Sequence, residues 1–383
     1  MPIILLGLFL RILIAFWNGF IGPSLGAGED ATKFHLIALH YSNQFGPYWE
    51  ETMMAGGIFH RFTSGWFYPY VLGQIYSVTT NSIFLGCLLS CFAWLLSAII
   101  LDKILRLLEF NNLNRQIALF IYILLPSSLM FTSVTLREAY QLLFVNLSIY
   151  SSLLIIQKRK LYYLIVLFFS MFAMSMLHKA FILLSIFLIA GIFFFYPIRT
   201  QARFLYTFIK LFIHIPIIIL IVFIGILVFE KYTDMILFAR IWDVVSVHQG
   251  YHKLARANYI FQPEINNFLD LVQFYPKSLL QYLFEPMPWR VSKYLDVVLL
   301  CENIIRGFLI LMAFNILIFQ KGWKRPSWLF VFLTYFFIES LWAMGTVNWG
   351  TAARHHIPSF GLLLIIAFIS FSKPRIFLNV KSI

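Results

Sequence analysis

Charged residues are scarce in this chain of 383 residues. Lys, Arg, Asp and Glu together make up 12% of it, against roughly 25% in an ordinary soluble domain. Hydrophobic residues make up 61%, and the mean hydropathy is +0.83. This balance excludes a soluble fold and places most of the chain in lipid. No stretch outside 230–296 is polar and long enough to fold by itself, so residues 1–383 are expected to form one membrane domain.

Cysteine and the common catalytic motifs are also rare or missing. Cys87, Cys91 and Cys301 lie within apolar runs, where core or lipid-facing positions are expected and metal-type spacing is absent. The sequence contains no Walker motif, no Rossmann glycine pattern, no His-Glu-x-x-His and no Gly-x-Ser-x-Gly. ATPase, dehydrogenase, zinc protease and serine hydrolase functions therefore lose their usual support.

Acidic residues are fewer than basic ones, 16 against 29, which gives a formal net charge of +13. The basic residues fall in small clusters between apolar runs rather than along one arm. This distribution is the one that the positive-inside rule produces in short cytoplasmic loops. Nucleic acid is therefore not an expected partner, whereas membrane lipids are.

Apolar runs of roughly 17–25 residues predict about ten membrane-spanning helices. They lie near 3–20, 82–101, 117–135, 139–157, 161–177, 180–197, 211–229, 297–320, 327–344 and 358–372. The first run lacks a basic n-region and carries Arg11, so we expect a retained span rather than a cleaved signal peptide. A further run, 66–80, is shorter, is interrupted by Pro69 and Gly73, and is rich in Trp and Tyr, which favour the membrane interface.

Loop charge decides how residues 66–80 are placed. If they lie in the interface, every basic loop faces one side, which is then cytoplasmic. The sequence therefore predicts an all-α polytopic bundle with both termini in the cytoplasm, in a bacterial inner or plasma membrane. The first outer loop, 21–81, carries interfacial helices, and a second long outer loop covers 230–296. All the strongly polar short motifs then fall on the outer face.

Two acidic residues, Glu29 and Asp30, follow the first span, with His35 close behind. A carboxylate at a membrane boundary can act as a general base or bind a cation. The structural alternative is that Asp30 caps a helix that continues through Tyr41. A divalent cation near the two acids is left open, although the ligand set is too thin to define one.

Two further polar turns interrupt apolar stretches on the same face. Arg137 and Glu138 precede a span, where the acid also suits a helix N-terminus. An ion pair at a membrane edge is nevertheless a poor choice for packing alone. His178 and Lys179 separate two spans and serve either as a plain hairpin turn or as ligands of an anion.

The last polar motif contains Arg354, His355 and His356, before the final span. The guanidinium fork of an arginine suits a phosphate, and the histidines add donors. Adjacent histidines do not face one ligand on a helix, so no metal site is expected here. The motif predicts an anion site.

In order and placement, these motifs resemble those of the C-type membrane glycosyltransferases, which use polyprenyl-phosphate sugars. The resemblance rests on the Glu29-Asp30-Ala31 loop, the Arg137-Glu138 turn and the run Gly350-Thr351-Ala352-Ala353-Arg354-His355-His356 before a closing helix. It implies that Asp30, or Glu29, is the catalytic base that deprotonates an acceptor hydroxyl. Arg354 and Lys179 would then hold the lipid-linked phosphate, and the Arg137-Glu138 turn would position the acceptor or the base.

The chain departs from many such transferases because no soluble C-terminal domain is evident, which points to a lipid or glycan acceptor. Two other functions compete with this one. An O-antigen or exopolysaccharide polymerase or ligase would depend on arginines more than on a carboxylate. A transporter or lipid flippase would place ionisable residues within its spans, whereas nearly all of them lie at loop ends here, with Arg11, Arg306 and Glu339 as the exceptions.

Overall fold

The computed structural model describes residues 2–23, 28–42, 67–197, 215–233, 257–259 and 268–369. Within these residues the fold is all-helical, apart from an isolated antiparallel bridge between Asn258 and Asn348. The longer helices are α1 (Pro2–Phe20), α2 (Gly28–Ser42), α5 (Phe67–Val78), α6 (Ile83–Leu107), α7 (Asn112–Leu124), α9 (Glu138–Lys158), α10 (Tyr163–Leu177), α11 (Ala180–Phe195), α13 (Ile215–Thr233), α15 (Phe268–Phe284), α16 (Tyr294–Ile318), α17 (Pro326–Gly345) and α19 (Ile357–Phe368). The short ones are α8 (Pro126–Phe131), η3 (Pro288–Arg290), η4 (Gly322–Lys324) and α18 (Trp349–His355).

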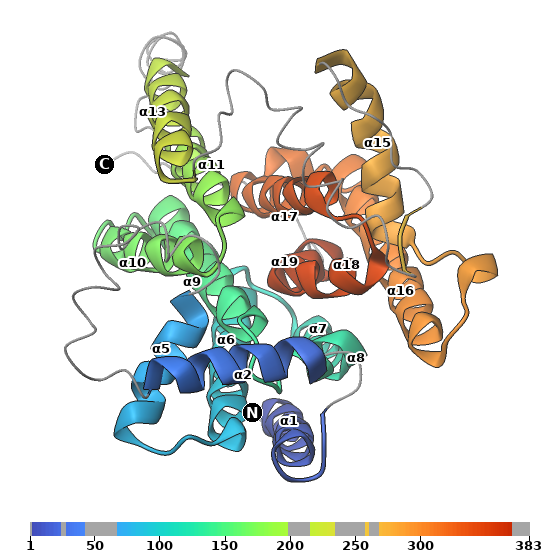
Figure 1. The fold of residues 1–383 in the computed structure, drawn as a ribbon. Coiled ribbons are helices and arrows are strands. Elements are labelled where there is room, and N and C mark those ends of the chain that lie inside the picture. The colour runs from blue at the N-terminus through green and yellow to red at the C-terminus, as the bar shows by residue number, and fades with distance from the viewer. Residues whose placement is uncertain are drawn as a thin grey trace, which may run out of the picture.

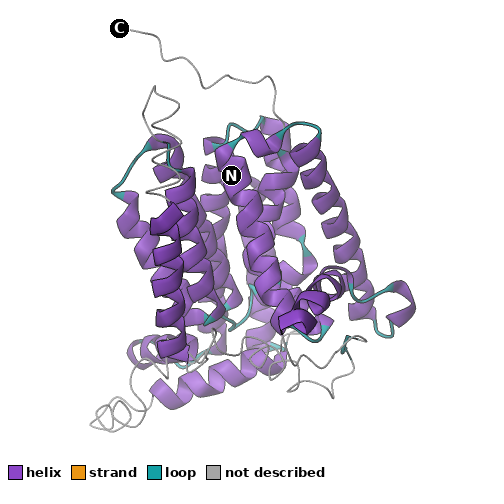
Figure 2. Cartoon of the chain, turned by 90° about the horizontal axis from the view of Figure 1, so that it is seen from above, coloured by secondary structure: helices purple, strands orange, loops and turns teal. Residues whose placement is uncertain are grey.

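Five of the described helices, α1, α6, α9, α16 and α17, are long and apolar enough to cross a membrane. Shorter apolar helices accompany them, namely α10, α11, α19 and the stretch Ile215–Leu227 of α13. The long helices run side by side along a common direction (Figure 2). Viewed along that direction, α19 lies in the middle, among α9, α16 and α17 (Figure 1). Its residues from Ile357 to Ala367 are all buried, so α19 is the centre of the core.

The expected span 117–135 is not one helix. It is divided into α7 and α8, because Pro126 cannot donate the backbone hydrogen bond that would continue α7. Residues 132–137 then follow as irregular chain before α9 begins at Glu138. The break lets buried side chains from α1 and α16 reach the backbone and hydroxyl groups of α8.

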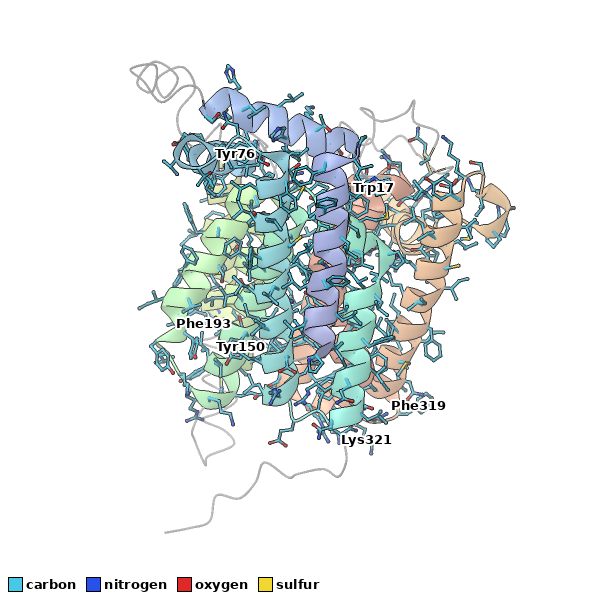
Figure 3. All side chains as sticks on the ribbon, turned by 90° about the horizontal axis from the view of Figure 1, so that it is seen from below. Trp17, Tyr76, Tyr150, Phe193, Phe319 and Lys321 are labelled. Atoms are coloured by element: carbon cyan, nitrogen blue, oxygen red, sulfur yellow. The ribbon has the colours of Figure 1, made fainter. Side chains whose placement is uncertain are left out.

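The helices α2 and α5 belong to the expected first outer loop. In Figure 3, α2 lies across one end of the bundle beside Tyr76 of α5, whereas Phe319 and Lys321 lie at the other end. The two helices approach closely at Gly73, where an added Cβ would stand 2.6 Å from the carbonyl oxygen of Ala38. Helix α2 begins at Gly28, so Asp30 lies inside its first turn instead of capping it.

Two expected loops contain helices. The segment 230–296 includes the end of α13, α15 and the start of α16, and the turn before the last span contains α18. Residues 234–256 and 260–267 of this segment lie outside the described residues. Helix α15 escaped the sequence analysis because its apolar positions are interrupted by Asp270, Pro276 and Lys277, which resemble a polar loop.

A buried arginine links the N-terminal helix to this break. Arg11 donates from Nε to Thr132 Oγ1 at 2.8 Å and from Nη2 to Ser128 Oγ at 3.1 Å. Its guanidinium also lies 3.5 Å from the ring centre of Trp94 and donates to the carbonyl of Ile123. These contacts replace the water that a charged group loses inside a bundle. Of the cysteines, Cys87 and Cys91 are buried, whereas Cys301 is exposed on α16.

Candidate active site

Three residues far apart in the sequence meet at the end of the bundle where α2 lies. Arg354 on α18 donates from Nε and Nη2 to Glu138 Oε1, at 2.9 and 2.7 Å, and from Nη1 to Asp30 Oδ2. Asp30 belongs to α2 and Glu138 begins α9. One guanidinium therefore joins three helices and two carboxylates, which the sequence placed in three separate motifs.

The two carboxylates differ in exposure, and this difference gives them different properties. The Asp30 side chain is 53% exposed, whereas that of Glu138 is 3% exposed. The second oxygen of Glu138, Oε2, is buried without a partner among the described residues. Burial lowers the pKa of Arg354, but Glu138 and Asp30 outweigh it and leave the pKa raised. Arg354 is therefore a permanent cation, with Glu138 as its fixed partner and Asp30 as its accessible one.

Arg137 adds a second guanidinium to this group. It donates from Nη1 to the carbonyl of Leu177 at 3.2 Å, while its Nε is buried without a partner in the described part of the chain. Burial lowers the pKa of Arg137. The carboxylates of Glu138 and Asp30 raise this pKa, the Arg354 cation lowers it, and the net direction is downward. Two arginines beside two acids give a site with a free donor at Arg137 and a free acceptor at Glu138.

His355 lies beside the arginines and is held by its own contacts. Its ring stacks on Trp342 with centroids 4.1 Å apart, and its Nδ1 lies 2.8 Å from Thr346 Oγ1. His178 packs against the same tryptophan, 4.6 Å between centroids. Burial and the Arg354 and Arg137 cations hold the pKa of His355 well below its usual value. The imidazole of His355 is therefore neutral.

The short helix α18 is fixed by local chemistry at its start. The Asn348 side chain accepts from Thr351 N at 2.7 Å, which is an ordinary N-cap. Trp349 donates from Nε1 to Asp296 Oδ1 at 3.0 Å, and the Arg290 guanidinium lies 4.7 Å from its ring centre. These contacts anchor α18 to α16 and present Arg354 toward α9.

His356 lies at the same junction but points away from Arg354. Its Nδ1 lies 2.7 Å from Glu339 Oε2, and its Nε2 lies 3.1 Å from the carbonyl oxygen of Tyr282. The adjacency of His355 and His356 in the sequence predicts one shared anion site, which the structure does not show. Adjacent side chains diverge on a helix, and these two serve different surroundings.

The remaining candidates lie at the margins. His35 on α2 bonds through Nδ1 to the Tyr76 hydroxyl at 3.0 Å, and burial lowers its pKa. Glu29 falls in the first turn of α2, but its side chain is outside the described residues. Lys179 is partly buried at the start of α11, directly after His178.

The sequence gives no distinct signal for Trp342, Thr346 or Tyr76, because aromatic side chains in apolar runs and a single threonine in a polar turn are common. The described part of the chain has no group of three or more His, Cys, Asp or Glu side chains that would hold a metal ion. A paired set of carboxylates and guanidinium groups can exchange a proton with a hydroxyl and bind an anion. Comparison of the chain with protein-family models, curated proteins and solved structures finds no match.

Proposed function

We propose that this protein is a membrane glycosyltransferase that moves a sugar from a polyprenyl-phosphate donor to a lipid or glycan acceptor. The observation that supports it best is the meeting of Asp30, Glu138 and Arg354, from α2, α9 and α18, at one end of the bundle. The reaction needs a carboxylate base and a positive group beside the departing phosphate. In this site the carboxylate of Asp30 and the guanidinium of Arg354 are in direct contact.

The contacts suggest an order of events. A donor phosphate competes with Asp30 for the Nη1 of Arg354, while the buried Glu138 keeps the other two nitrogens in place. Asp30 is thereby released and takes the proton of the acceptor hydroxyl. The hydroxyl oxygen forms a bond to the anomeric carbon as the bond from that carbon to the phosphate oxygen breaks. The polyprenyl phosphate leaves with the electron pair, and the configuration is inverted.

Topology forms part of this proposal. We assign ten crossings in all, to the five long apolar helices, the four shorter ones and the α7–α8 pair. Lys321 lies at the end of the bundle opposite α2 (Figure 3), and we assign that end to the cytoplasm because its loop is basic. Both termini are then cytoplasmic, and the site opens on the outer face of a bacterial inner membrane.

The test uses purified protein in lipid nanodiscs with a polyprenyl-phosphate sugar carrying a radiolabel and a crude lipid extract. Wild type should yield a new labelled product. Asp30→Asn should abolish it without loss of folding, and Lys33→Gln, an exposed change on the same helix, should not. Glu29→Gln leaves Asp30 intact and so shows which of the two neighbouring acids the reaction requires. Full turnover by Asp30→Asn and Glu29→Gln, with loss in Arg354→Ala, would favour a polymerase or ligase that depends on arginine.

A transporter or lipid flippase is the second candidate, and a specific observation favours it. Arg306, Glu302 and Glu339 are 3%, 2% and 1% exposed within α16 and α17, and buried ionisable residues in spans often mark transport pathways. Protein in sealed vesicles that moves labelled lipid across the bilayer, and forms no glycosylated product, would support transport and refute the transferase.

A further inference from the structure

Glu339 of α17 and His356, at the start of α19, form a buried pair outside the candidate active site. Their side chains are 1% and 4% exposed, and Nδ1 of His356 lies 2.7 Å from Oε2 of Glu339. The other histidine nitrogen, Nε2, lies 3.1 Å from the carbonyl oxygen of Tyr282. Each polar atom of the imidazole therefore has one defined partner.

The chemistry of these partners fixes the number of protons. A carbonyl oxygen only accepts, so Nε2 of His356 carries a hydrogen. The contact between Nδ1 and Oε2 of Glu339 then needs one more proton, on either atom. Without it, two lone pairs would face each other at 2.7 Å in a site without water. The pair is satisfied only while it holds that proton.

Ser359 gives the pair room for a second proton. Its hydroxyl lies within reach of Glu339 Oε1 and also 3.0 Å from the backbone carbonyl of His356. One hydroxyl hydrogen cannot serve both acceptors fully. When Ser359 donates to Glu339, the pair holds one proton. When it donates to the carbonyl of His356, Oε1 of Glu339 can carry a proton of its own and donate to Ser359.

The groups around the pair decide where the shared proton resides. Burial and the Arg306 cation lower the pKa of His356, and Glu339 opposes them, with the net direction downward. Of the two groups in the contact, the imidazole of His356 is therefore the one whose protonated form is disfavoured. Among the described residues, the other titratable or charged groups that interact with the pair are Arg306 of α16, Tyr282 of α15, Tyr335 of α17 and His355 of α18.

Two of these neighbours also offer a route for exchange. The hydroxyls of Tyr282 and Tyr335 are buried without a hydrogen-bond partner among the described residues. Buried hydroxyls left in this way usually bind internal water. Glu339 interacts electrostatically with both tyrosines. Each hydroxyl can both donate and accept a hydrogen bond, so these two groups can exchange a proton with the surroundings of the pair.

We propose that Glu339 and His356 form a proton-binding site that sets the position of α18. The backbone N–H of His356 donates to the carbonyl of Ala352 at 3.0 Å and so closes the last turn of α18, two residues after Arg354. Loss of the shared proton separates Glu339 from His356 and loosens this turn. The site does not depend on the reaction proposed above, and its ligand is the proton.

Infrared difference spectroscopy of the protein in nanodiscs, from about pH 5 to pH 9, tests the site directly. A carbonyl-stretch band of a protonated carboxyl group should be present in wild type, disappear at high pH and be lost in Glu339→Gln. Glu302→Gln is the matched control, since Glu302 is also 2% exposed but bonds to Ser127 N. It should leave the Glu339 component unchanged. A band that Glu339→Gln does not alter would overturn the proposal.

A second variant keeps the test valid if Glu339→Gln does not fold. In His356→Gln the imidazole is gone, so the band of Glu339 should shift, and an unshifted band would refute the pairing. The positioning role is measured by hydrogen exchange in peptides covering 349–355. Glutamine at 339 can donate to Nδ1 and accept from Ser359, so Glu339→Gln should match wild type at neutral pH. Glu339→Ala should exchange faster, and equal exchange in both variants would exclude the role.

Discussion

Removal of the Arg354 side chain tests how the candidate site is held together. Arg354→Ala leaves the Glu138 carboxylate, 3% exposed, without its cation. Breaking a buried pair in this way costs about 3–5 kcal/mol. Glu138→Ala leaves Arg354, which is 17% exposed and keeps Asp30, so the loss of hydrogen bonds to a charged group costs about 1–3 kcal/mol. Asp30→Ala removes a partner that is 53% exposed, worth about 0–1 kcal/mol.

The expected order of destabilisation is therefore Arg354→Ala, then Glu138→Ala, then Asp30→Ala. Unfolding of the purified protein in mixed micelles, followed by circular dichroism as denaturing detergent is added, gives these free energies. The Arg354→Ala, Glu138→Ala double variant should cost less than the sum by about 0.5–3 kcal/mol, because the Glu138 carboxylate that Arg354→Ala leaves uncompensated is gone. Arg106→Ala is the control, since the Arg106 side chain, which pairs with Asp102, is 59% exposed. Equal costs at Glu138 and Asp30, or an additive double variant, would refute this account of the site.

Three further predictions concern topology, packing and pH. In a variant without native cysteines, a cysteine introduced at Val78 should react with an impermeant thiol reagent on intact cells. A cysteine at Trp323 should react only after permeabilisation. Equal accessibility at the two positions would contradict the proposed sidedness. Gly73→Val should lower the free energy of unfolding by about 1–3 kcal/mol, because the added Cβ meets the backbone of α2. Gly345→Ala should change it by under about 0.5 kcal/mol, because an added Cβ there has no atom within 4 Å. The melting temperature should fall as pH drops below about 6.5, because His355 binds a proton in the unfolded chain but stays neutral in the folded protein. His355→Gln should flatten this pH dependence. An unchanged slope in the variant would refute the assignment of the dependence to His355.

The long helices could be predicted well because lipid imposes a simple rule on composition. The expected spans 139–157 and 327–344 differ from α9 and α17 by one residue at each end. Arg137 and Glu138 mark the start of α9 for a physical reason, since charged groups do not enter an apolar helix without partners. The break between α7 and α8 follows from Pro126 and was within reach of the same reasoning.

The contacts of the site could not be predicted, because hydrophobic patterns fix depth and sidedness but not which helices are neighbours. Arg354 and Glu138 are 216 residues apart, and nothing in either motif indicates the other. Shared sidedness was the strongest signal, and the structure brings together Asp30, Glu138 and Arg354 from that set. Sidedness gave no warning that His355 and His356 serve different surroundings. The signal for His356 was Glu339, because an acid within an apolar span requires a polar partner, and that partner is His356.

Arg11 has a consequence for how the protein is made. Helix α1 is synthesised before α8, and the hydroxyls that receive its guanidinium, on Ser128 and Thr132, emerge 117 and 121 residues after Arg11. A lone arginine at the centre of a nascent span costs about 2.5–3.5 kcal/mol during insertion. Helix α1 therefore stays beside the insertion machinery, or tilted toward the lipid headgroups, until α8 is available to bind Arg11. In the N-terminal half, α1 thus reaches its final place only after α6, α7 and α8 have been made.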